Sequence, residues 1–95
     1  MIFEFAPIAY GNSENTIKYL EKMSDSFYLF DLYYSPNPTR FNLIEPETFT
    51  EFIADVEQRK YRYTDIFALD KRTPDCEIIK TRLSELEGTP DEIVL

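Results

Sequence analysis

Histidine is absent from the 95-residue sequence, and glycine and cysteine are scarce, with two residues and one residue respectively. A chain without histidine lacks the commonest general base and the commonest transition-metal ligand of proteins, so we expect no such metal site. Two glycines, Gly11 and Gly88, cannot form a G-x-G-x-x-G motif or a P-loop, which excludes a glycine-rich cofactor loop. The lone Cys76 cannot form an intramolecular disulfide. Because no segment resembles a signal peptide or a membrane-spanning helix, we expect a cytoplasmic protein.

Apolar and acidic side chains are abundant instead. Apolar residues make up 43% of the chain and aromatic residues 16%, which predicts one folded domain with a single core rather than a disordered chain. Eighteen acidic residues outnumber ten basic ones, for a net charge of −8. Nucleic acids and anionic membranes recruit basic surfaces, so we expect neither of them as a partner.

Residue periodicity and turn signals predict an α/β domain in the order β-α-β-β-α-β-α, with a mixed sheet. Phe49, Phe52, Ile53 and Val56 give the clearest helical pattern, because their spacing places them on one helix face. The stretch FYLFDLYY is apolar on both alternating faces, so we expect this strand to be covered on both sides. Over residues 1–95, the single domain is expected to hold strands at 2–6, 27–34, 41–45 and 63–70, helices near 14–24, from 46 and from 73 to a stop at Gly88, and a tail at 89–95.

Two of the carboxylates near the expected strands interrupt apolar runs. Glu4 lies within IFEFAP and Asp31 within FYLFDLYY, and a buried carboxylate without a partner is costly. Each one therefore needs solvent or a donor, for which Lys71, Arg72 or a tyrosine hydroxyl would serve. Two facing acids could also act as general acid and base or hold a divalent cation, which makes Glu4 and Asp31 the candidate catalytic residues. The other acids, interpreted as solvated or capping residues at strand edges and ends, are Glu45, Asp65 and Asp70.

An interaction surface is a further hypothesis. Cys76 is interpreted as a structural residue, because no histidine can pair with it and Asp75 and Glu77 oppose a thiolate. Seven tyrosines and eight phenylalanines could place aromatic side chains at a binding surface, and the first strand has no earlier element to cover its edge. The expected interface residues are Ile2, Phe3, Phe5, Tyr28, Tyr33 and Tyr34.

The order of these stretches resembles the C-terminal part of FkbM-type methyltransferases, which are S-adenosylmethionine-dependent enzymes with a class I, Rossmann-like fold. The resemblance covers residues 2–70, through IFEFAP, FYLFDLYY, a proline-rich turn, FNLIEPETFTEF and YTDIFALD. It implies that Glu4 and Pro7 match the strand end that borders the active-site side of such a sheet. No residues match the family's cofactor loop, its ribose-binding acid or its Asp-x-Glu-Gly segment. The resemblance therefore implies S-adenosylmethionine for the parent family, but neither its binding nor catalysis for these 95 residues.

Three hypotheses for the function follow from these observations. The chain is the C-terminal segment of an FkbM-like methyltransferase, inactive in this form, or it is a self-standing acidic module that binds a protein or forms a homodimer. The third hypothesis is a small enzyme or divalent-cation binder that uses Glu4 and Asp31. Because IFEFAP has the character of a central strand that continues an earlier sheet, we expect a second copy of the chain to cover it.

Overall fold

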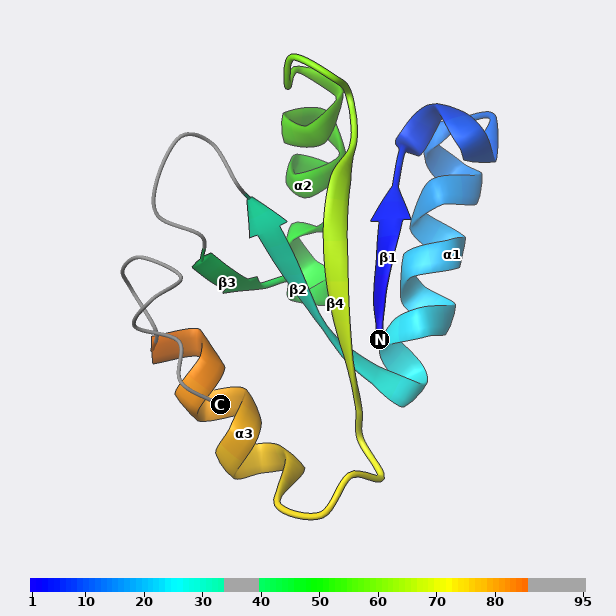
Figure 1. The fold of residues 1–95 in the computed structure, drawn as a ribbon. Helices are drawn as coiled ribbons and strands as arrows, with labels where there is room; N and C mark the ends of the chain where they lie inside the picture. Colours follow the sequence, from blue (N-terminus) through cyan, green and yellow to red (C-terminus); the bar gives the residue numbers. More distant parts are fainter. Residues whose placement is uncertain (34–39, 86–95) are drawn as a thin grey trace.

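A four-stranded sheet with helices on both faces forms the fold of the computed structural model, which describes residues 1–33 and 40–85 (Figure 1). The strands are β1 (Ile2–Phe5), β2 (Phe27–Tyr33), β3 (Arg40–Leu43) and β4 (Thr64–Asp70). The helices are α1 (Ser13–Ser26), α2 (Phe49–Glu57) and α3 (Cys76–Glu85), with short 3-10 turns η1 (Pro7–Tyr10) and η2 (Pro46–Thr48). The predicted stop at Gly88 and the tail at 89–95 lie outside the described residues.

The strands are ordered β1-β4-β2-β3, and each neighbouring pair in the described residues is antiparallel. β1 and β2 therefore run parallel to each other on either side of β4, and β3 and β4 do so on either side of β2. The expected mixed sheet is not found here, because β4 inserts between β1 and β2 and separates the parallel strands. The insertion also corrects the expected position of the first strand. Among the described residues, β1 is an edge strand with one hydrogen-bonded neighbour, not a central strand.

One face of the sheet carries the larger core, beneath α1 and α2 (Figure 1). Phe49, Phe52, Ile53 and Val56 are all buried in this core, which confirms the helical pattern of that segment. Leu29 of β2 faces the same core and is 1% exposed. Full burial of one large apolar side chain contributes about 1.5–3 kcal/mol, so this face holds α1 and α2 firmly against the strands.

The opposite face is partly covered by α3, where Phe30, Leu69, Cys76 and Leu83 form a smaller core. Because Leu29 and Phe30 follow each other and are buried on opposite faces, β2 is covered on both sides, as its composition predicts. Cys76 lies inside this core as an apolar packing residue, which agrees with its structural interpretation. On this face, α3 does not extend over the edge strand β1 (Figure 1).

Short local signals begin the first two helical segments. η1 begins at Pro7 directly after β1, and this turn was not expected from the sequence. Gly11 then takes a φ of 91°, a backbone conformation that glycine adopts without strain. Asn12 caps α1, because its side-chain oxygen accepts a hydrogen bond from the Asn15 N–H at 2.8 Å. The chain therefore turns back along the sheet within a few residues of β1.

Candidate functional site

Asp31, on the central strand β2, is 5% exposed and is fully engaged by donors from within the chain. Arg59 binds both carboxylate oxygens, with Nη1 at 3.1 Å from Oδ1 and Nη2 at 2.8 Å from Oδ2. The Thr64 hydroxyl donates a third hydrogen bond to Oδ1 at 2.6 Å. We expected Lys71 or Arg72 among the donors, but neither of them binds Asp31. Asp31 faces α1 and α2, whereas those two cations follow the far end of β4.

Arg59 also binds a second carboxylate. Its Nη2 and Nε atoms lie 2.6 and 3.2 Å from Oδ2 of Asp55, one turn earlier in α2. The Arg59 side chain is 12% exposed, whereas the Asp55 side chain is 65% exposed. Arg59 therefore connects a buried carboxylate of the sheet with the outer surface of α2. Such bidentate pairing satisfies the charge of the buried Asp31 carboxylate within the chain.

Glu4 lies on the opposite face of the sheet from Asp31. It is exposed on β1 and stands directly across from Asp65 of β4, whose other neighbour in the register is Leu32. Asp31 instead stands across from Ile66, on the face that α1 and α2 cover. The two candidate catalytic acids therefore do not face each other. Among residues 1–33 and 40–85, no group of three or more acidic or cysteine side chains is placed to hold a metal ion.

The outer edge of β1 presents backbone hydrogen-bonding groups. Met1 and Ala68 exchange two hydrogen bonds, from the Met1 ammonium to the Ala68 carbonyl at 3.2 Å and from the Ala68 N–H to the Met1 carbonyl at 2.7 Å. By the alternation of an antiparallel ladder, Phe3 then bonds to β4, and the N–H and C=O groups of Ile2 and Glu4 point away from it. No strand in the described residues pairs with these outward groups. We call them the free edge of β1.

The expected interface residues fall into three places. Ile2 is 60% exposed at the free edge, and Phe3 is half-buried there with its ring edge-on to Tyr19 at a centroid separation of 6.4 Å. Phe5 is 0% exposed inside the larger core, so it is not available to a partner. Tyr28 lies on β2 and packs against α3. Tyr33 ends β2, and Tyr34 lies outside the described residues.

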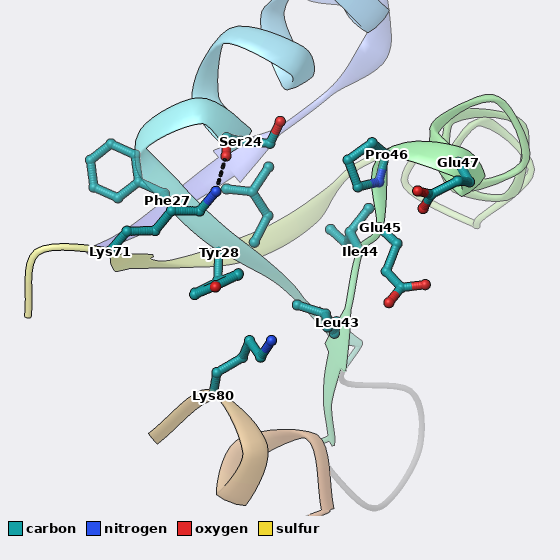
Figure 2. A pocket seen from close by; sticks show the side chains of 11 residues that line it. Ser24, Phe27, Tyr28, Leu43, Ile44, Glu45, Pro46, Glu47, Lys71 and Lys80 are labelled. Atoms are coloured by element: carbon teal, nitrogen blue, oxygen red, sulfur yellow. Dashed lines mark hydrogen bonds between the residues drawn. The ribbon is translucent and has the colours of Figure 1, made fainter. Parts of the chain in front are cut away.

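A pocket of about 190 Å³ lies between the end of α1, the start of β2, the end of β3 and α3 (Figure 2). The Lys71 and Lys80 ammonium groups lie 4.9 and 4.6 Å from the centroid of the Tyr28 ring. Lys71 also donates to the Ser24 carbonyl at 2.7 Å, as drawn in Figure 2. The Tyr28 hydroxyl donates to Glu77, and this hydrogen bond raises the pKa of Tyr28 above its usual value.

Both lysines of this pocket are therefore engaged within the chain. Lys80 also forms an ion pair with Glu77 at 3.3 Å, on the same helix α3. Together the lysines, Tyr28 and Glu77 link α3 to β2, which favours a structural role over ligand binding. The sequence places Lys71 and Lys80 far from Tyr28, so no local pattern could have predicted this cluster.

Comparisons with known proteins add no relative to this picture. No protein-family model matches the chain, and neither does any curated protein or solved structure. In the part of the chain that the structure describes, none of the helices combines the length and the apolar character that crossing a membrane requires. In the described residues, the free edge of β1 is thus a feature with unpaired backbone groups, whereas the buried acid and the two lysines of the pocket have partners within the chain.

Proposed function

We propose that this chain is an acidic protein-interaction module that binds a strand of a partner along the free edge of β1. The observation that carries the proposal is the outward direction of the N–H and C=O groups of Ile2 and Glu4. An unpaired edge is a template for another strand, and natural proteins seldom leave one unused or unprotected. Addition of a strand to a sheet edge is a common mode of peptide recognition, in which backbone hydrogen bonds supply the affinity.

A proline substitution tests this proposal directly. The Glu4 N–H points away from β4, so Glu4→Pro removes one outward donor and preserves the ladder between β1 and β4. We expect a seven-residue peptide of alternating threonine and valine, at millimolar concentration, to shift the Ile2 and Glu4 amide signals of the unmodified chain in NMR spectra. Glu4→Pro should bind this peptide at least several-fold more weakly while its circular dichroism spectrum stays unchanged.

A matched control variant also lacks the Glu4 carboxylate but retains the backbone N–H donor. Glu4→Ala also removes the carboxylate but retains the N–H, so it should bind the uncharged peptide as well as the unmodified chain does. Peptide-induced shifts confined to residues away from β1, or equal binding by the proline and alanine variants, would rule out the edge as the binding element.

The strand order supports a second proposal, that the chain is related to the sheet-closing part of an FkbM-type methyltransferase. The support is the insertion of β4, antiparallel, between the parallel strands β1 and β2. The resemblance implies that a helix, a strand ending in aromatic residues and a returning strand finish the sheet of such an enzyme. In such a sheet, the free edge of β1 would be covered by a strand of the cofactor-binding half. The two proposals therefore assign the same edge to a strand supplied from elsewhere.

This second proposal assigns no catalysis to the chain, because the cofactor loop of the family has no counterpart in its sequence. Isothermal titration calorimetry with S-adenosylmethionine should therefore give no binding heat. Binding in the micromolar range would contradict the sheet-closing interpretation, since it would require a cofactor site within these residues.

A further inference from the structure

We infer that the free edge of β1 selects a partner strand with a basic residue opposite Glu4, and that it disfavours a second copy of this chain. The inference rests on the proposed function, because it takes the same edge as the binding element and adds the chemistry of the partner. Three features of the edge carry it: an unneutralised acidic pair on one face, apolar side chains around it, and the arrangement that self-pairing would impose.

The acidic pair consists of Glu4 and Asp65, which stand directly opposite each other on adjacent strands. Glu4 is exposed and Asp65 is half-buried, and neither has a basic partner in the described residues. Like charges directly opposite each other destabilise a strand pair, whereas opposite charges stabilise it. A strand added beyond β1 would place one of its side chains directly beside Glu4 on this face. A lysine or arginine at that position would neutralise the row.

The neighbouring positions favour apolar side chains. On the same face as Glu4, two residues earlier, Ile2 is 60% exposed. On the other face, the half-buried Phe3 ring lies edge-on to Tyr19 of α1. A strand seated on the edge would therefore cover apolar surface at Ile2 and Phe3 and meet the negative charge of Glu4. The partner that fits is an extended segment in which a basic residue alternates with apolar or small residues.

A second copy does not offer this pattern. The two-fold antiparallel register that uses every outward group of both edges places Ile2 opposite Glu4 of the other copy, with Phe3 opposite Phe3 at the centre. That register brings both Glu4 side chains and both Asp65 side chains onto one face without a cation among them. Each copy also carries a net charge of −8. Charged side chains on edge strands are a known means of preventing edge-to-edge association, and the exposed Glu4 fits that role.

The test compares two peptides of seven residues, one alternating lysine and valine and the other alternating glutamate and valine, each acetylated and amidated. Their binding is followed by the NMR amide signals of residues 2 and 4 in 50 mM salt. We expect the lysine peptide to bind roughly three- to tenfold more tightly than the glutamate peptide. In 1 M NaCl this preference should largely disappear, because the Debye length falls to about 3 Å.

Charge-reversed variants separate the local effect from the overall charge of the chain. Glu4→Lys should reverse the preference, so that the glutamate peptide binds more tightly. Glu85→Lys makes the same change in net charge at the end of α3, a helix that packs on β3 and β4 rather than on β1, and it should keep the original preference. Equal loss of the preference in both variants would overturn the inference, because the overall charge would then make the selection.

The remaining outcomes distinguish this inference from the proposed function. Equal binding of both peptides, with shifts at residues 2 and 4, would overturn the charge selection and leave the edge as a binding element. If no peptide, including the uncharged one, shifts the amide signals of residues 2 and 4, the proposed function is overturned together with the inference. Shifts of the same two signals on raising the protein concentration without peptide, accompanied by dimers in sedimentation, would overturn the inference by showing a second copy at the edge.

Discussion

Replacing Arg59 by methionine should destabilise the fold more than replacing its partner Asp31 by asparagine. Arg59→Met leaves the Asp31 carboxylate, which is 5% exposed, with the Thr64 hydroxyl as its remaining side-chain donor. Asp31→Asn leaves the Arg59 charge beside Asp55, whose side chain is 65% exposed. The first substitution therefore leaves a buried charge without its ionic partner, and the second leaves no such charge.

The expected magnitudes differ accordingly. Removal of one partner of a buried ion pair costs about 3–5 kcal/mol, so we expect a loss near 3 kcal/mol or more for Arg59→Met. Asp31→Asn keeps an acceptor of the same shape and loses part of a charged hydrogen bond, at a cost of about 1–2 kcal/mol. The free energy of unfolding of a domain of this size is about 5–14 kcal/mol, so the arginine substitution removes a large share of it.

Urea titration followed by circular dichroism measures both losses. With an m value of about 1.5 kcal/mol per molar, a loss of 3 kcal/mol lowers the midpoint by about 2 M. Asp55→Asn is the control for the exposed half of the cluster and should cost less than about 1 kcal/mol. The double variant Asp31→Leu/Arg59→Met should recover most of the stability lost in Arg59→Met, because apolar residues replace a buried pair at little cost.

Two results would refute this reasoning. One is a destabilisation by Arg59→Met that does not exceed that by Asp31→Asn. The other is a double variant that is no more stable than Arg59→Met alone, because the stranded carboxylate would then not be the source of the loss. The m values must agree among the variants for the comparison to report stability alone.

Three further predictions concern single side chains. Arg72 holds the pKa of Asp70 at about 2, so this carboxylate contributes stability that is complete above about pH 4 and is lost as the pH falls toward 2; its NMR titration should show the low midpoint, and Arg72→Ala should return it to the usual range. Burial raises the pKa of Tyr10 to about 12, so stability should fall as the pH rises from about 10 to 12, and the phenolate absorbance change at the highest pH should vanish in Tyr10→Phe. Glu4→Gln should stabilise the fold by about 0.2–1 kcal/mol in urea titrations, because it removes the repulsion with Asp65; a lower midpoint would contradict the charge argument.

Local patterns predict most of the helices and strands, and the structure confirms them. The helix expected near 14–24 is α1, and the strand expected at 63–70 is β4, each displaced by no more than two residues at either end. Both are specified by signals within the segment, namely a cap followed by helical spacing in one case and a continuous β-rich run in the other. Such signals act over a few residues and therefore survive without knowledge of the partner elements.

Strand order is a different kind of information. Whether β1 is a central or an edge strand depends on where residues 64–70 pair in the sheet. An apolar run has the same sequence pattern in both positions. One face of β1, which carries Ile2 and Glu4, is exposed, and this exposure follows from the pairing of β1 with β4. The sequence pattern of a strand indicates which side chains could be buried, whereas the strand order determines which of them are buried.

The partner of Asp31 was hidden for a related reason. The run QRKYRY holds Arg59 among other cations, and its composition alone does not show which of them turns inward. The backbone decides this after α2, where Arg62 takes a φ of 57° and its N–H donates to the Arg59 carbonyl at 3.0 Å. Arg59 lies one helical turn beyond Asp55, with its N–H bonded to the Val56 carbonyl at 3.1 Å, and its side chain reaches Asp31 of the sheet. Loop geometry of this kind follows from tertiary packing rather than from the local sequence.

The insertion of β4 between β1 and β2 also sets the order of events in folding. Neither parallel strand can form a ladder with the other, so β1 and the β2–β3 hairpin stay separate until residues 64–70 join them. The contacts that complete the sheet, such as Ile2 with Phe67, close nearly the longest loops in the described chain. Such distant contacts slow folding and make it cooperative. During synthesis, the four-stranded sheet therefore cannot be completed until its last strand is made, and a nascent chain that ends before residue 64 holds β1 apart from the β2–β3 hairpin.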